Sequence, residues 1–256
     1  LNNVTDYSGI IGLITCDAFG DCGSQKITVI GHADSTDVSA SNANVVYEYA
    51  PGGSSLGEGH LVVPATVPQR GGTLVMLDVD TGEVLANFGG GIMMTPHGIH
   101  VDDDGNVWVT DFANNAAGTK GQQVHKFSPS GELLMSLGTA GQAGSGPNQF
   151  NQPNDVIVGP DGSIYVSDGH NGQGMTSNAA MEEGRAAGST ARIIKFSADG
   201  PRLMEWGQIG VRHGEFRTPH AMEFDSQGRL WVADRGNHRI EIFDQQGNYL
   251  ESRYMY

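Results

Sequence analysis

The sequence predicts an all-β protein built as a β-propeller from four-stranded blades. A unit of four short apolar stretches recurs three times, over 96–138, 153–207 and 219–252. Val, Ile, Trp and Phe fill these stretches, and such residues favour strands. The turns between the first two stretches carry Asp-Gly or Gln-Gly pairs, which supply the positive φ of tight hairpins. Four-stranded units repeated along a chain are typical of propeller blades.

Each unit has the same order of elements. The first strand begins at a proline, a tight turn follows, and the second strand ends at an aspartate. The third and fourth strands come after a connection of variable length. The predicted strands are 96–101, 107–111, 124–127 and 133–138 in the first unit, 153–158, 164–168, 192–196 and 203–207 in the second, and 219–224, 230–234, 239–243 and 249–252 in the third.

The segment before residue 96 contains a weaker copy of the repeat. Residues 74–78 and 84–88 are apolar stretches on either side of Thr81-Gly82-Glu83, and we interpret them as the outer two strands of an earlier blade. Apolar runs within the first 50 residues are candidates for further strands. We therefore divide the chain into an N-terminal segment, 1–70, with uncertain strands, and a repeat region, 71–256. At about 40–45 residues per blade the ring is either incomplete or has up to six blades.

Composition excludes several function classes. The net charge is −15, with Lys+Arg 14 against Asp+Glu 29. A chain without a basic stripe cannot neutralise phosphates, so nucleic-acid binding is not expected. No apolar run approaches the roughly 20 residues that span a bilayer, so we predict no membrane span.

Two cysteines indicate the compartment. Cys16 and Cys22 flank a short loop with Gly and Asp, and we predict that they form a disulfide. Two free thiols are the alternative. Because disulfides persist in oxidising compartments, we expect an extracellular or periplasmic protein.

Candidate site residues gather on one face of the predicted blades. A tight hairpin brings the start of its first strand beside the end of its second. His97, Asn154 and His220 open first strands, while His170 and Arg235 follow second strands. The second strands close with aspartates that we expect to cap turns: Asp111, Asp168 and Asp234. The long insertions 112–123 and 169–191 fall on the same face, where a site is expected.

Two groups of residues carry a family resemblance. The stretches 162–169 and 230–240, which include Val232-Ala233-Asp234-Arg235, resemble NHL repeats. The motifs Thr95-Pro96-His97-Gly98-Ile99 and Thr218-Pro219-His220-Ala221-Met222 make the chain similar to the peptidyl-α-hydroxyglycine α-amidating lyase family. The resemblance covers roughly residues 71–252. It implies a propeller that usually has six blades.

The resemblance also implies roles for four residues. His97 and His220 match two of the family's three zinc ligands, and Arg235 matches its substrate-binding arginine, which suits a carboxylate. His170 stands where the family has a catalytic tyrosine, so it is a catalytic base, a ligand or a bystander. The third Pro-His motif has no counterpart here. Two histidines alone predict weak or absent zinc binding, and His170 is the first candidate for a third ligand. Calcium is implied by the resemblance only.

Two functions remain open at this point. In the first, the chain is a lyase-like enzyme that uses zinc to cleave a C–N bond in a carbinolamide-type, peptide-like substrate. In the second, Pro-His only begins a strand, and the propeller is a non-catalytic, exported platform that binds protein partners. The content of tightly held zinc distinguishes the two.

Overall fold

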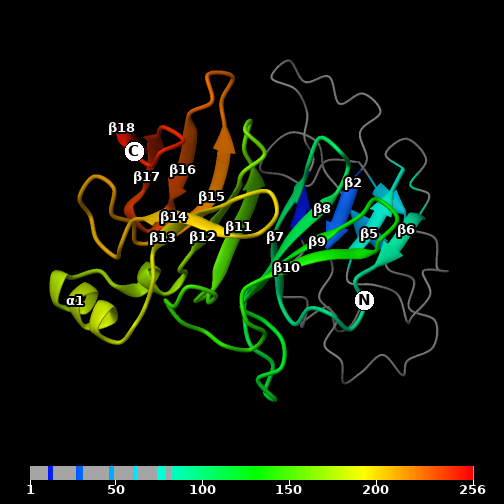
Figure 1. The fold of residues 1–256 in the computed structure, drawn as a ribbon, viewed down its shortest axis with the longest axis horizontal. Helices are drawn as coiled ribbons and strands as arrows, with labels where there is room; N and C mark the ends of the chain where they lie inside the picture. Colours follow the sequence, from blue (N-terminus) through cyan, green and yellow to red (C-terminus); the bar gives the residue numbers. More distant parts are fainter. Residues whose placement is uncertain are drawn as a thin grey trace. The chain divides into compact units, whose positions relative to one another are not determined.

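A computed structural model describes residues 74–78, 82 and 84–255, together with the backbone of four short strands before residue 63. The chain forms two compact units, Leu1–Ile92 and Met93–Tyr256. Within the described residues nearly all regular structure is β-strand, as Figure 1 shows, so the predicted all-β class is confirmed. No helix in this part of the chain is long and apolar enough to cross a membrane.

Where the structure describes the first unit, it shows a four-stranded sheet and a two-stranded one. Its strands are β1 (Ile11–Leu13), β2 (Ile27–Ile30), β3 (Val46–Glu48), β4 (His60–Val62), β5 (Leu74–Leu77) and β6 (Val84–Phe88). The sheet has the order β1-β2-β5-β6, and β3 pairs with β4. The prediction that 74–88 holds the outer strands of an earlier blade is confirmed, because β5 and β6 are the third and fourth strands of this sheet. Cys16 and Cys22 lie outside the described residues, and the division at residue 70 stays a prediction.

The second unit contains three four-stranded antiparallel sheets, which we call the first, second and third blades. Their strands match the sequence prediction to within two residues at each end. The first blade comprises β7 (Pro96–Val101), β8 (Val107–Asp111), β9 (Gln123–Phe127) and β10 (Leu133–Leu137); the second comprises β11 (Pro153–Val158), β12 (Ile164–Asp168), β13 (Arg192–Phe196) and β14 (Arg202–Trp206); the third comprises β15 (Pro219–Phe224), β16 (Leu230–Asp234), β17 (Arg239–Phe243) and β18 (Tyr249–Tyr254).

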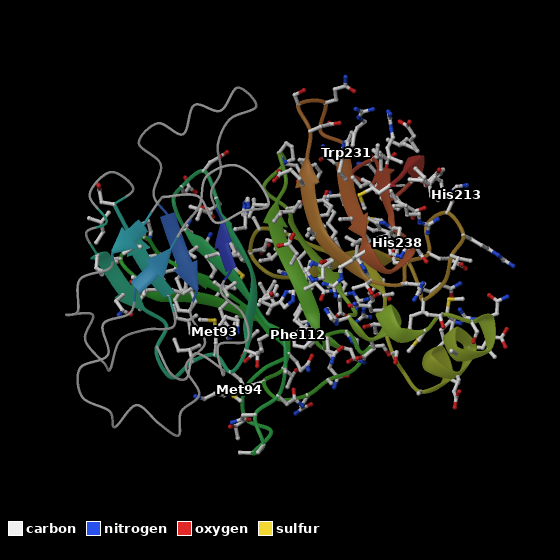
Figure 2. All side chains as sticks on the ribbon, turned by 180° about the vertical axis from the view of Figure 1, so that it is seen from behind. Met93, Met94, Phe112, His213, Trp231 and His238 are labelled. Carbon is white, nitrogen blue, oxygen red and sulfur yellow. The ribbon has the colours of Figure 1, made fainter. Side chains whose placement is uncertain are left out.

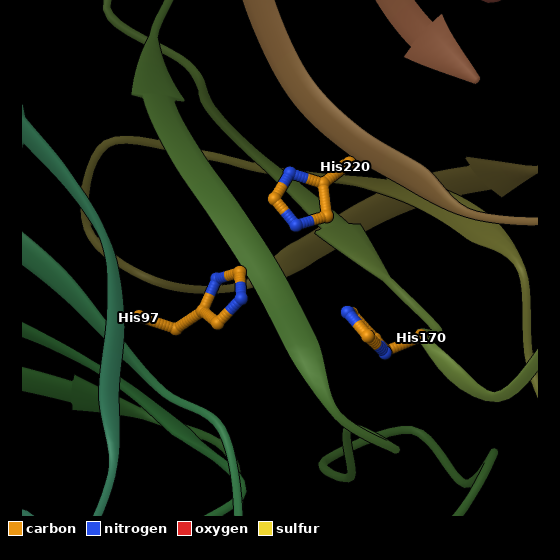
Figure 3. Close-up of side chains that lie close together, drawn as sticks. All are labelled: His97, His170 and His220. Atoms are coloured by element: carbon orange, nitrogen blue, oxygen red, sulfur yellow. The ribbon is translucent and has the colours of Figure 1, made fainter. Parts of the chain in front are cut away.

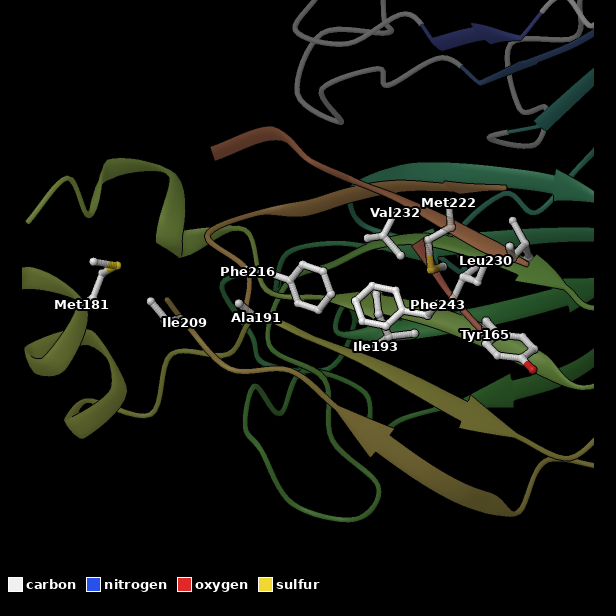
Figure 4. Packing of buried hydrophobic residues seen from close by; sticks show 11 residues of the cluster. Tyr165, Met181, Ala191, Ile193, Ile209, Phe216, Met222, Leu230, Val232 and Phe243 are labelled. Carbon is white, nitrogen blue, oxygen red and sulfur yellow. The ribbon is translucent and has the colours of Figure 1, made fainter. Parts of the chain in front are cut away.

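Apolar side chains fill the space between neighbouring blades. Tyr165, Phe216 and Phe243 belong to a cluster between the second and third blades, which Figure 4 shows from close by. Ile164 and Val166, on the other face of β12, belong to a second cluster with Trp108 and Phe150. Every residue of β12 is buried, since both faces of its blade are covered. Each large side chain buried in this way contributes about 1.5–3 kcal/mol to the free energy of unfolding.

A buried aspartate closes the second strand of each blade. Asp168 accepts hydrogen bonds from Asn151 N at 2.7 Å and from Arg192 Nε at 2.9 Å. The two equivalent aspartates make the same kind of contact to the loop that enters their own blade: Asp111 with Met94 N and Thr95 N, and Asp234 with Arg217 N and Thr218 N. The predicted structural role of these three residues is confirmed. They fix the point at which each first strand begins.

The insertion 169–191 contains two helical segments, which the sequence did not lead us to expect. A 3₁₀ turn, η1, spans Asn171–Gly174, and α1 spans Asn178–Ala186. Ser177 caps α1 by accepting a hydrogen bond from Ala180 N at 3.2 Å, as serine does at helix N-termini. Met181 is the buried apolar residue that attaches α1 to the core.

His125 is buried in β9. Its Nδ1 lies 2.9 Å from Ser136 Oγ, and its Nε2 has no hydrogen-bond partner among the described residues. Burial lowers the pKa of His125 to about 4, because the charged imidazolium is disfavoured away from water.

We expect His125 to make the fold acid-sensitive. The unfolded chain takes up a proton near pH 6.5 and the folded protein only near pH 4, so the free energy of unfolding is at its full value above pH 6.5 and falls as the pH drops towards 4. The loss due to this residue is on the order of 3 kcal/mol. Urea unfolding between pH 7 and 4.5 measures it. His125→Gln should show a shallower pH dependence than the wild type, because it removes the buried imidazole. A slope equal to that of the wild type would contradict the assignment.

Candidate metal centre

The three residues in the Pro-His register lie in β-bulges. The strand pairing skips one or two residues directly after Pro96, Pro153 and Pro219. The skipped positions contain His97, Asn154 and His220. A bulge turns a side chain out of the regular alternation of its strand. The first strands lie side by side, with β11 between β7 and β15, so these side chains meet at one place.

His170 reaches the same place from a loop. It follows β12 after Gly169, whose φ is +117°. A Cβ atom at this position would lie 1.9 Å from Thr190 O, so glycine is required here. In Figure 3, His97, His170 and His220 gather around a common centre.

The three imidazoles form a compact cluster. Their ring centroids are 5.0 Å apart for His97 and His220, 5.7 Å for His170 and His220, and 5.9 Å for His97 and His170. One ring nitrogen of each lies within 4.8 Å of the other two. The structure therefore adds His170 to the two histidines that share the repeat register.

Hydrogen bonding defines the tautomer of His97. Its Nδ1 lies 2.8 Å from the carbonyl oxygen of Asn154. A carbonyl oxygen only accepts, so Nδ1 carries the proton and Nε2 keeps its lone pair. This is the form in which a histidine binds a metal through Nε2.

All three imidazoles are neutral at pH 7. Burial lowers the pKa of His97, and the charge of Arg235 lowers it further, against the opposing effect of the hydrogen bond with Asn154. Burial, and then the positive charge of Arg235, lower the pKa of His170 and that of His220 to about 4. Neutral imidazole is the ligating form.

Arg235 stands directly beside this cluster. It begins the 3₁₀ turn η2 (Arg235–Asn237), and its Nη2 lies 2.6 Å from His170 Nε2 and also donates to Gln173 Oε1. A guanidinium only donates, so His170 Nε2 is the acceptor. Arg235 Nε is buried without a hydrogen-bond partner among the described residues. The arginine thus offers a positive charge and a free donor at the edge of the cluster.

Phe112 forms an apolar wall that sequence reasoning missed. Its ring stacks on His97 at 5.2 Å and meets His170 edge-on at 5.1 Å. Phe112 directly follows Asp111, as Arg235 directly follows Asp234. This equivalent position in the repeat could have identified Phe112 as a site residue from the sequence. Figure 2 labels Phe112 and two exposed loop residues, His213 and His238, which do not belong to the cluster.

The donor set fits a catalytic zinc ion. Such sites use three protein ligands and leave a fourth position open, and His₃ is one of the known sets. Zn–N distances of about 2.0 Å place tetrahedral ligand nitrogens about 3.3 Å apart, so the rings would close in slightly from their present spacing. Binding through His170 Nε2 also requires Arg235 to move away from that nitrogen.

Comparisons with known proteins agree with the family resemblance of the sequence motifs. The model of the NHL repeat matches residues 93–116 and 216–243. The chain is 37% identical over 183 residues to peptidyl-glycine alpha-amidating monooxygenase B of Xenopus laevis, and this match covers 69% of the chain and 18% of that protein. It is 32% identical over 199 residues to peptidyl-alpha-hydroxyglycine alpha-amidating lyase 1 of Drosophila melanogaster, covering 73% and 32%. It is 37% identical over 162 residues to human NHL repeat-containing protein 3, covering 61% and 41%.

The chain thus spans less than half the length of each of these relatives. Among solved structures, a streptogramin B lyase has a TM-score of 0.47 at 14% identity, with 71% of this chain and 47% of that chain covered.

Proposed function

We propose that this chain, an NHL-repeat protein 30–32% identical to amidating lyases and 37% identical to an amidating monooxygenase, is a zinc-dependent lyase. Its substrate would be a carbinolamide of the peptidyl-α-hydroxyglycine type. The C–N bond would break, the hydroxyl-bearing carbon would become the aldehyde carbonyl of glyoxylate, and the hydroxyl proton would pass to the nitrogen of the leaving amide. The observation that carries this proposal is the convergence of His97, His170 and His220 beside Arg235. A neutral His₃ set next to a cation suits a substrate with both a hydroxyl and a carboxylate.

Each residue of the site would have a separate role. His97, His170 and His220 would hold the zinc, which would act as a Lewis acid towards the substrate hydroxyl. Arg235 would bind the substrate carboxylate through paired, charge-assisted hydrogen bonds. This frees His170 Nε2, because the guanidinium then donates to the carboxylate. Phe112 would exclude water from one side of the cluster.

We assign His170 to the metal rather than to proton transfer. A catalytic base works best with a pKa near the operating pH, and burial lowers the pKa of His170 to about 4. Its place within the cluster suits a third ligand. A role as catalytic base stays an untested alternative.

The proposal includes an exported protein, extracellular or periplasmic, that acts on peptide-like substrates. The predicted disulfide between Cys16 and Cys22 supports an oxidising compartment. The alternative of a non-catalytic platform for protein partners is supported by one feature, a shallow groove on the third blade lined by Ala221, Phe224, Trp231 and Ile240. Glu223 and Asp225 also line this groove, but nothing in it identifies a partner. We favour the lyase because the histidine cluster does indicate a ligand.

Release of glyoxylate from an α-hydroxyglycine peptide tests the proposal. We expect one zinc per chain and turnover that stops on chelation and returns with zinc. Arg235→Ala should raise KM roughly 10- to 100-fold, since a hydrogen bond to a charged group contributes about 1.5–3 kcal/mol, while the zinc content stays the same. Arg253→Ala, at an exposed position, is the matched control. A zinc-loaded, full-length protein without turnover would contradict the lyase, and a metal-free protein with a large apolar contact to another chain would favour the platform.

A further inference from the structure

We infer that Asn154 is a positioning residue that holds the three histidines together. It occupies in the second blade the register that His97 and His220 occupy in the first and third. The sequence only shows that Asn154 is not an imidazole ligand, whereas the structure gives it a different role. This inference rests on the three-histidine site of the proposed function and deepens it.

Asn154 contacts the peptide or side chain of every member of the cluster. Its carbonyl oxygen lies 2.8 Å from His97 Nδ1. Its side-chain Nδ2 donates to Pro219 O at 2.9 Å and to Gly169 O at 3.3 Å. Pro219 directly precedes His220, and Gly169 directly precedes His170. Asn154 therefore links the first blade, the loop after β12 and the third blade. It does so at the three points from which the histidine side chains project.

The environment of Asn154 favours an amide donor, while its Oδ1 is buried without a hydrogen-bond partner among the described residues. Asn154 is fully buried, and its two amide hydrogens face two carbonyl oxygens. Aspartate would place a carboxylate against both carbonyls, and alanine would leave both without this donor, which is unfavourable in a buried place. The orientation of the amide follows from the same contacts, because only the nitrogen can face two acceptors.

The first blade is shaped to reach Asn154. A Cβ atom on Gly98 would lie 2.4 Å from Asn154 O and 2.7 Å from the Cα of Asp155. Glycine directly after His97 therefore allows β7 to approach β11 closely enough for the hydrogen bond. Thr110 Oγ1 completes the contact by donating to Asn154 O at 3.2 Å.

The consequence is a pre-arranged cluster. The carbonyl of Asn154 fixes the tautomer and the ring orientation of His97, and its amide fixes the peptide groups from which His170 and His220 project. Partners that orient metal ligands in this way typically change metal affinity by about 10- to 100-fold when they are removed.

NMR of the metal-free, full-length protein tests the inference without zinc or turnover. We expect nuclear Overhauser contacts between the ring protons of His97 and His220 in the wild type, and their loss in Asn154→Ala. Asn151→Ala is the matched control, since it removes only an amide contact to Gly188 O in the same blade, and it should keep them. If the alanine variant does not fold, Asn154→Ser, which retains a single hydrogen-bond donor, replaces it in the test. The serine variant should show weaker contacts between the His97 and His220 rings than the wild type.

Zinc affinity, measured by competition with a chelator, is the second test of the inference. It should fall about 10- to 100-fold in Asn154→Ala and stay within twofold of the wild type in Asn151→Ala. Ring contacts that are unchanged in the folded Asn154 variants overturn the inference. Ring contacts that respond as expected in a protein without lyase turnover would sink the proposed function and leave this inference standing.

Discussion

Replacing His220 by alanine should weaken zinc binding more than 100-fold and end metal-dependent turnover. His220 supplies one of three imidazoles whose ring nitrogens lie within 4.8 Å of one another. Loss of a residue that only orients a ligand costs about 10- to 100-fold, and loss of a ligand itself should cost more. Competition with a chromophoric chelator gives the affinity. His213→Ala, at an exposed loop position, should bind zinc as the wild type does.

The variant His170→Tyr separates the two roles that remain for this position. It introduces the residue type that the resembling lyase family has there. If His170 is the third ligand, zinc affinity should fall about as far as in His220→Ala. Zinc affinity close to that of the wild type, combined with altered turnover, would instead assign His170 to proton transfer. Unchanged affinity in both variants would mean that zinc binds elsewhere.

The strands could be predicted closely because the information that specifies them is local. β8 and β16 have the predicted bounds, since a short continuous apolar run beside a turn with Gly defines each of them. α1 was not predicted, because its stability depends on the packing of Met181 against the second blade rather than on a long apolar period. The burial of His125 cannot be predicted from the sequence for a related reason, because a third strand is covered on both faces only once the neighbouring elements are in place.

The candidate site was predicted in part. The repeat register placed His97 and His220 together, and the end of β12 placed His170 on the same face. The contributions of Phe112 and Asn154 depend on ring stacking and on hydrogen bonds between blades, for which the sequence contains no periodic signal. The proximity of Arg235 to His170 likewise depends on two loops that meet only in the folded unit.

Asp234→Asn should reduce the free energy of unfolding by about 3 kcal/mol, the lower end of the usual cost of breaking a buried ion pair by removing one partner, because Glu241 still pairs with Arg239. Asp234 is fully buried and accepts hydrogen bonds from Arg239 Nε at 3.1 Å and from Thr218 N at 3.1 Å. An amide in its place removes the carboxylate beside Arg239 Nε and leaves Glu241, whose Oε1 lies 3.2 Å from Arg239 Nη1, as the remaining counter-charge. Urea unfolding at pH 7 measures the loss. Glu251→Gln, which removes an exposed pair with Arg253, should cost less than about 1 kcal/mol.

The equivalent position in the first blade provides an internal comparison. Gln123 faces Asp111 where Arg239 faces Asp234, and burial raises the pKa of Asp111. Asp111→Asn leaves no buried arginine behind, so its cost should be closer to the roughly 1–3 kcal/mol of an unsatisfied buried hydrogen-bonding group. Equal losses for the two variants would show that the backbone contacts, rather than the ion pair, account for the stability. A larger loss for Asp234→Asn, accompanied by weaker zinc binding, would show that the same residue that closes the third blade also secures the start of β15, from which His220 projects.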